Sequence, residues 1–185
     1  MTKVTLLGDS IRQIGYGPRV PALLGDEFTV WQPGENCRFA QYTLRGMWDW
    51  AGGMEGSEIV HWNNGLWDVC DIFGDGNFTP LETYVDFMVR TARILQKRYG
   101  KVIFATTTPV TEQNPHNRNT EIIRYNSAIV PVLSDMGIII NDLHGLMYAD
   151  IDRFIRKDDN IHLTEEGADV CARQVADMIL KAAQD

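Results

Sequence analysis

The chain has 185 residues, which is enough for one domain with a substantial hydrophobic core. Its formal charge of −8 argues against nucleic acid or an anionic membrane surface as the main partner. No apolar run approaches the roughly 18 residues of a membrane span, and the first residues show no secretory signal. We therefore expect a single cytoplasmic domain over residues 1–185, although a chain trimmed of its signal would look the same.

The cysteines and histidines give little sign of a disulfide framework or a metal site. The three cysteines are odd in number and far apart, at Cys37, Cys70 and Cys171. The four histidines include no compact ligand pair, and the glycine-rich motifs of nucleotide-binding proteins are absent from the sequence. We therefore expect neither a metal nor a cofactor.

Five short apolar runs alternate with segments of helical character. In chain order, the expected strands are residues 3–8, 27–32, 58–63, 101–108 and 137–142. The expected helices lie near residues 17–24, 36–50, 80–99, 120–136 and 164–183. Nearly continuous apolar strands separated by helices predict a parallel sheet that is covered on both faces. In such sheets ligands bind beyond the carboxyl ends of the strands, so functional residues should follow each strand.

The helix expected at residues 80–99 has recognisable signals at both ends. Thr79 should cap it, with Pro80 in the first turn and Glu82 in capping-box position, and Gly100 should stop it. Its apolar residues follow the three-and-four spacing of a core-facing stripe, at Tyr84, Phe87, Met88, Thr91, Ala92 and Leu95.

The first strand ends in the sequence Gly-Asp-Ser at residues 8–10. Turn formation is the ordinary use of these residue types, and a serine becomes a nucleophile only beside a base. Asp159 and His162, three residues apart before the last helix, supply such a base. A neutral imidazole can take the serine proton, while a carboxylate on its other ring nitrogen fixes the tautomer. The pattern predicts a Ser10, His162 and Asp159 triad, with Asp158 as the alternative carboxylate.

Four sequence blocks extend this pattern over nearly the whole chain, and together they resemble the SGNH (GDSL-type) hydrolases. The blocks are "GDSI" at 8–11, Gly34 in "PGEN", "NNGLWD" at 63–68 and "DDNIH" at 158–162. The resemblance implies a three-layer α/β/α sandwich with a five-stranded parallel sheet and flavodoxin-like topology. It also implies ester hydrolysis without a cofactor or metal, with Ser10 as nucleophile, His162 as general base and Asp159 as its orienting partner.

The same resemblance implies an oxyanion hole formed by the backbone N–H groups of Ser10 and Gly34 and by an asparagine side chain. The third block of the family is commonly G-x-N-D, and here Trp67 stands where that asparagine would be. An indole offers a single N–H on a large rigid plane and does not replace an amide there. We expect Asn63 at the strand end to be the donor, with Asn64 as the alternative.

The sequence therefore predicts a serine esterase that removes a small acyl group, such as acetyl, from a carbohydrate-like or other polar alcohol. A thioesterase or lysophospholipase with the same machinery and a non-catalytic carbohydrate-binding domain are the alternatives. The expected partner is a small-molecule ester, and the sequence leaves the oligomeric state open. Trp67 is a candidate for stacking on a sugar ring, against the commoner use of tryptophan in a core. The loop at 116–118 either contacts substrate or is a solvated polar loop, and His61 is expected to be structural.

Overall fold

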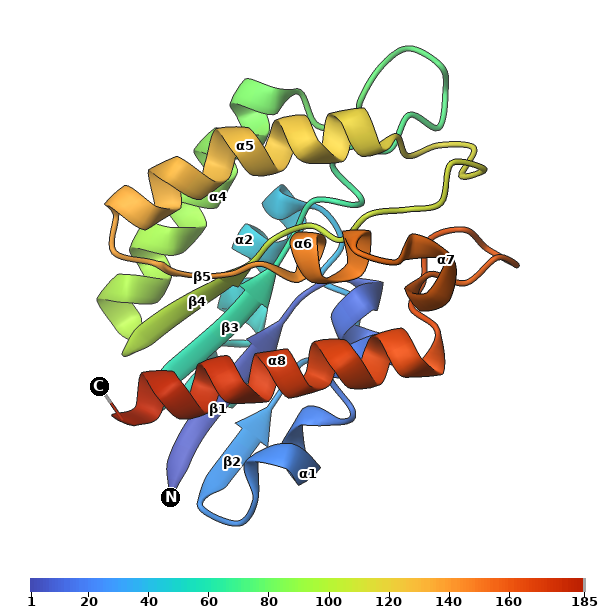
Figure 1. Cartoon of the computed structure of the whole chain (residues 1–185). Coiled ribbons are helices and arrows are strands. Elements are labelled where there is room, and N and C mark those ends of the chain that lie inside the picture. The colour runs from blue at the N-terminus through green and yellow to red at the C-terminus, as the bar shows by residue number, and fades with distance from the viewer. Residues whose placement is uncertain (185) are drawn as a thin grey trace.

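A five-stranded sheet with the strand order β2-β1-β3-β4-β5 forms the centre of the molecule (Figure 1). The computed structural model describes residues 1–184. Its strands are β1 (Thr2–Leu7), β2 (Phe28–Trp31), β3 (Ile59–Asn63), β4 (Lys101–Ala105) and β5 (Ile139–Asn141). All four pairs of neighbouring strands are parallel, which confirms the predicted fold class.

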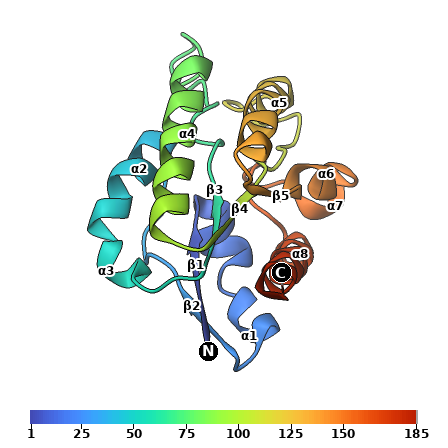
Figure 2. The same cartoon turned by 90° about the vertical axis from the view of Figure 1, so that its left-hand side faces the viewer.

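Helices cover both faces of this sheet. Figure 2 shows α2 (Ala40–Asp49), α3 (Ala51–Met54) and α4 (Leu81–Arg98) on one side, and α1 (Val20–Leu24) and α8 (Glu165–Gln184) on the other. The long helix α5 (Asn119–Asp135) packs beside α4. The short helices α6 (Leu143–Tyr148) and α7 (Ile151–Phe154) pack against α8. The core is therefore two layers of apolar contacts, one on each face of the strands.

The segment after β1 differs from its prediction. Instead of one helix over 17–24, the chain forms a π-helical turn, η1 (Ile11–Tyr16), and then the short α1. The three short helices α3, α6 and α7 were also not predicted, because each is shorter than two turns and has no resolvable period. Single π-helical turns are frequent at functional sites, and this one starts directly after Ser10.

The strand β4 and the helix α4 correct two further details. The predicted strand at 101–108 ends at Ala105, because the Asn126 side chain binds both the backbone N–H and the carbonyl of Thr107. The predicted cap at Thr79 is wrong: the residue before the helix is Pro80, and no side chain caps it. Thr79 instead accepts a hydrogen bond from the Tyr125 hydroxyl through its backbone carbonyl. The core-facing stripe is confirmed, with Phe87 only half-buried.

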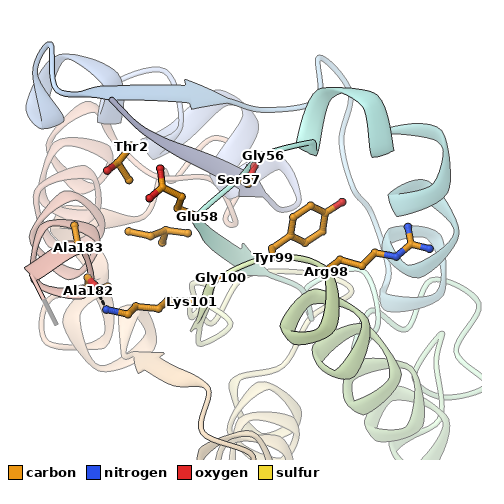
Figure 3. Close-up of a pocket in the computed structure, with 11 residues that line it drawn as sticks. Thr2, Gly56, Ser57, Glu58, Arg98, Tyr99, Gly100, Lys101, Ala182 and Ala183 are labelled. Carbon is orange, nitrogen blue, oxygen red and sulfur yellow. Dashed lines mark hydrogen bonds between the residues drawn. The ribbon is translucent and has the colours of Figure 1, made fainter.

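A cavity of about 420 Å³ opens at the amino ends of the strands (Figure 3). Thr2, Ile59 and Lys101, each at or near the start of its strand, line it. Its lysine is already engaged, since Nζ of Lys101 donates to the carbonyl of Ala182 at 2.6 Å. Ligands of parallel sheets bind at the opposite, carboxyl ends, so the functional site is expected at that edge.

Candidate active site

Ser10 lies between the end of β1 and the start of η1, at the carboxyl edge of the sheet. The preceding Gly8 is required by a close approach, because a Cβ there would lie 2.0 Å from Oδ1 of Asn63. Asp9 turns inward and accepts a hydrogen bond from the Ile11 N–H at 2.9 Å, which closes the first turn after the strand. The serine side chain is left half-buried at the rim.

The structure brings Ser10, His162 and Asp159 into one hydrogen-bonded line. Nε2 of His162 lies 2.8 Å from Oγ of Ser10, and Nδ1 lies 3.0 Å from Oδ2 of Asp159. The other oxygen of Asp159 accepts the backbone N–H groups of His162 at 2.9 Å and Ile161 at 3.1 Å. These backbone bonds fix the carboxylate within its own turn, so that it presents one oxygen to the imidazole.

The two neighbouring aspartates have different hydrogen-bond partners, although Nε of Arg156 also lies 3.5 Å from Oδ2 of Asp159. Burial raises the pKa of Asp159, but hydrogen bonds from the backbone and side chain of His162 and from the backbone of Ile161 outweigh burial, so its pKa is lowered. Asp158 points away to Arg156, which holds both of its oxygens, one of them at 2.9 Å from Nε. The imidazole of His162 therefore hydrogen-bonds Asp159, the carboxylate that the sequence favours, and not Asp158.

The loop at residues 111–114 supports the turn that contains Asp159 and His162. Asn160 has a left-handed backbone, with φ of 64°, which asparagine tolerates better than most residues. Its side-chain oxygen accepts from the Thr111 hydroxyl at 2.7 Å, and its carbonyl accepts from the Thr111 N–H and the Asn114 side chain, both at 3.2 Å. Thr111 and Asn114 were missed in the sequence, where only the Asn160 residue type signalled an unusual turn.

The two asparagines at the end of β3 make internal contacts. Asn63 is 5% exposed; its Nδ2 donates to Oδ1 of Asp9 at 3.0 Å, and its Oδ1 accepts from the Tyr16 hydroxyl at 2.7 Å. Asn64 is fully buried, donates to the carbonyl of Arg38 at 2.8 Å and accepts from Nε1 of Trp62 at 2.7 Å. Both amides thus hold neighbouring chain segments together, a role that the sequence expectation did not include.

Arg12 is a further residue that the sequence analysis missed. Its side chain is 1% exposed, and its guanidinium donates to the carbonyls of Gly8 at 3.2 Å, Pro33 at 2.9 Å and Glu35 at 2.7 Å. The guanidinium therefore ties the loop after β2 to the loop that carries Ser10. Gly34 lies within this tied loop; it is exposed, and its carbonyl accepts from the Gln13 side chain at 2.9 Å.

Asp9 is a buried carboxyl group beside the serine. Burial raises its pKa, and hydrogen bonds from the Asn63 side chain and the Ile11 N–H offset only part of that rise. Its Oδ2 has no hydrogen-bond partner among the described residues. The positive charge of Arg12 and the nearby His162 also lower the pKa of Asp9, so the two buried groups beside Ser10, Asp9 and Arg12, interact electrostatically.

Two cavities meet at Ser10. The first, which we call the apolar cavity, has a volume of about 260 Å³ and includes Phe39, Leu66, Trp67, Phe78 and Ile161 in its wall. The second, which we call the histidine-side cavity, has a volume of about 440 Å³ and includes Ile14, Arg156, His162, Thr164 and Glu165. The sequence predicted neither cavity, because their walls come from loops that are distant along the chain.

The remaining candidate residues divide between these cavities and other places. Trp67 is 41% exposed in the wall of the apolar cavity, and His116 and Asn117 line the same cavity. Arg118 lines a different hollow, away from Ser10. Within residues 1–184, no three His, Cys, Asp or Glu side chains gather as metal ligands, and no helix is long and apolar enough to cross a bilayer.

Solved structures with the same fold include esterases and acylhydrolases. The chain superposes on the acetyl xylan esterase AlAXEase with a TM-score of 0.79 at 24% identity, covering 97% of this chain and 98% of that one. For the acetylxylan esterase Axe2 of Geobacillus stearothermophilus the TM-score is 0.78 at 18% identity, over 96% and 94% of the two chains. For a lipase/acylhydrolase of Enterococcus faecalis it is 0.77 at 18% identity, over 97% and 95%.

No protein-family model and no curated protein matches the sequence. The structural likeness nevertheless extends over almost the whole of each chain, so it includes all four sequence blocks. The chain therefore has the α/β/α fold of these esterases and acylhydrolases, as its resemblance to the SGNH (GDSL-type) hydrolases implied.

Proposed function

We propose that the chain is a serine ester hydrolase of the SGNH (GDSL) type, with Ser10 as nucleophile, His162 as general base and Asp159 as its orienting carboxylate. The observation that carries this proposal is the unbroken hydrogen-bonded line from Oγ of Ser10 through both ring nitrogens of His162 to Asp159. A binding module has no need of a serine that is aligned with a base. This arrangement therefore favours an enzyme over a non-catalytic carbohydrate-binding domain.

The geometry supports a two-step acyl transfer. Oγ of Ser10 attacks the ester carbonyl carbon while Nε2 of His162 takes the hydroxyl proton. The imidazolium then gives that proton to the leaving alcohol oxygen as the carbon–oxygen bond breaks, which leaves an acyl group on Ser10. Water repeats the attack with His162 as base, releasing the acid and restoring the serine. The lowered pKa of Asp159 keeps it ionised, so that it stabilises the imidazolium in both steps.

Negative charge develops on the carbonyl oxygen during each attack and needs hydrogen-bond donors. The backbone N–H groups of Ser10 and Gly34 are proposed donors, and Asn63 is the proposed side-chain donor through an amide that it also uses to hold Asp9. Arg12 supports this arrangement indirectly, because it fixes the carbonyls on either side of Gly34.

The proposed substrate is an acyl ester of a polar alcohol. Two of the similar structures are named as acetyl xylan esterases, which supports acetyl esters of carbohydrates as candidates. Lysophospholipase or thioesterase activity is the second candidate, and the largely apolar wall beside Ser10 is the observation that favours it.

Replacement of the serine tests the proposed activity. Ser10→Ala should lower ester turnover by at least about 10,000-fold, because no other group supplies the nucleophile. Hydrolysis of acetylated xylo-oligosaccharides and simple alkyl esters would be measured, with Ser134→Ala on the exposed part of α5 as the matched control. A fluorophosphonate should label Ser10 in the wild-type protein. Labelling elsewhere, or full activity in Ser10→Ala, would contradict the proposed nucleophile.

A further inference from the structure

The two cavities that meet at Ser10 differ in whether they contain the catalytic histidine. His162 lines the histidine-side cavity and is absent from the wall of the apolar cavity. The leaving alcohol oxygen must receive its proton from Nε2 of His162, so the alcohol departs on the side of the imidazole. The acyl substituent lies on the other side of the carbonyl carbon. This places the alcohol in the histidine-side cavity and the acyl group in the apolar cavity.

The chemical character of the two walls agrees with this assignment. Arg156 and Glu165 give the histidine-side cavity charged groups that suit a polar alcohol, because both side chains stay exposed although they pair with Asp158 and Arg19. The hydroxyl of Thr164 in the same wall donates to the carbonyl of Arg153. The wall of the apolar cavity has no Lys, Arg, Asp or Glu, and three Phe or Trp rings and three aliphatic side chains predominate there over Ser10, Cys70, His116 and Asn117. Its amide residue, Asn117, is turned to the protein, since Nδ2 donates to the carbonyl of Leu66 at 2.8 Å.

The size of the apolar cavity exceeds what an acetyl group needs. A methyl or methylene group is close in size to a water molecule, whose share of liquid volume is about 30 Å³. By this measure the cavity of about 260 Å³ has room for about eight such groups, whereas acetyl brings one. An acetyl ester would leave most of the apolar wall in contact with water.

We infer that the apolar cavity binds the acyl chain of a medium-chain ester, of about six to eight carbons by the volume argument above. The inference rests on the proposed function and specifies its substrate: an ester of a medium-chain fatty acid with a polar alcohol. Phe39, Trp67 and Phe78 form the aromatic part of the wall that contacts the chain.

The first experiment measures kcat/KM for ethyl acetate, butyrate, hexanoate and octanoate by pH-stat titration. Each methylene buried in the cavity should raise kcat/KM by about fourfold, so hexanoate should exceed acetate by on the order of 100-fold. A preference for acetate, with hydrolysis still dependent on Ser10, would overturn this inference and leave the proposed function standing. No hydrolysis of any ester would overturn both.

An isomeric pair tests which side of the ester enters the apolar cavity. Ethyl hexanoate and hexyl acetate contain the same atoms but exchange the long chain between acyl and alcohol. The inference predicts that ethyl hexanoate is hydrolysed at least about 30-fold faster, since only its chain lies on the side away from His162. Faster hydrolysis of hexyl acetate would reverse the assignment of the two cavities.

A tryptophan variant tests the wall itself. Trp67→Ala should lower kcat/KM for ethyl hexanoate by about tenfold and change that for ethyl acetate by less than about twofold, because acetate does not reach the ring. Trp48→Ala is the matched control, as Trp48 is 71% exposed on α2 and does not line the cavity. Equal losses on both esters in Trp67→Ala would contradict its role in binding the chain.

Discussion

At the scale of single residues, Arg12 is the side chain whose role is most informative. A buried guanidinium needs partners for its donors, and here the two terminal nitrogens donate to three backbone carbonyls, while Nε has no partner among the described residues. Arg12→Lys keeps the charge, but an ammonium cannot span three carbonyls that are arranged around a planar fork. The loop around Gly34 then loses part of its anchor.

We therefore expect Arg12→Lys to lower kcat by about 10-fold to 100-fold with little change in KM, because the proposed oxyanion donor, the Gly34 N–H, would act in the transition state. It should also lower the free energy of unfolding by about 1–3 kcal/mol, the cost of a buried carbonyl left without a partner. Steady-state kinetics and urea denaturation measure the two effects. Arg45→Lys, in an exposed ion pair with Asp49, is the control. An unchanged kcat in Arg12→Lys would show that the loop needs no such anchor.

Asn63 has both a structural and a proposed catalytic role, and the two can be separated. Asn63→Ala leaves the buried Tyr16 hydroxyl without its partner and removes one of the two hydrogen bonds to Oδ1 of Asp9, which keeps the bond from the Ile11 N–H. The free energy of unfolding should fall by about 2–4 kcal/mol, and kcat should fall on the order of 100-fold if the amide also donates to the oxyanion. Urea denaturation and kinetics are measured on the same protein. A stability loss with wild-type kcat would leave only the structural role.

At the scale of elements, the turn from Asp159 to His162 depends on the left-handed backbone of Asn160. Asn160→Gly keeps this conformation and should reduce kcat/KM by no more than about threefold, although it loses the side-chain bond to Thr111. Asn160→Val places a β-branched residue at φ of 64°, at a cost of about 1–3 kcal/mol. We expect it to lower kcat/KM by at least about 10-fold by displacing Asp159 from the imidazole. Equal kinetics in the two variants would show that the turn tolerates either backbone.

The elements also show what the sequence could and could not predict. All five strands and the long helices were predicted within a few residues, because hydrophobic periodicity is a local signal. The proximity of Ser10, His162 and Asp159 was predicted because the four sequence blocks occur in order and resemble those of the SGNH (GDSL-type) hydrolases, whereas the Asp-x-x-His pair alone is a weak signal. Arg12 and the bond from Thr111 to Asn160 were missed, since contacts to backbone carbonyls leave no pattern along the chain. Thr79 was misread as a cap because its side chain hydrogen-bonds the distant Asp68, a tertiary contact that outweighs its local preference.

At the scale of the whole molecule, two buried groups give stability opposite dependences on pH. Burial raises the pKa of Asp68 from 3.8 to about 7, and burial lowers the pKa of His61 from 6.5 to about 3. As pH rises from about 4 to 7, the unfolded chain loses a proton that folded Asp68 retains, so the Asp68 contribution falls. As pH falls below about 6.5, His61 binds a proton in the unfolded chain but stays neutral in the folded chain. The contribution of His61 to the free energy of unfolding therefore falls.

Asp68→Asn should isolate one of these contributions. An asparagine oxygen can still accept the Ala40 N–H that Asp68 holds at the start of α2 at 3.1 Å, but it carries no charge to desolvate. The free energy of unfolding of the variant minus that of wild type should be near zero at pH 4, rise up to about pH 7 and then remain constant. A pKa difference of about 3 sets an upper limit of roughly 4 kcal/mol on this gain.

Urea denaturation of both proteins from pH 4 to pH 8.5 measures that difference directly, and every other titrating group cancels from it. Asp26→Asn, which removes an exposed carboxylate, is the control and should change stability by less than about 0.5 kcal/mol throughout. In the variant, no titration of Asp68 offsets the effect of His61 on the free energy of unfolding. The free energy of unfolding of the variant itself should therefore rise steadily from about pH 4 to pH 6.5. A flat difference between Asp68→Asn and wild type would mean that Asp68 stays ionised in the folded chain, held by more donors than the Ala40 N–H and Thr79 provide.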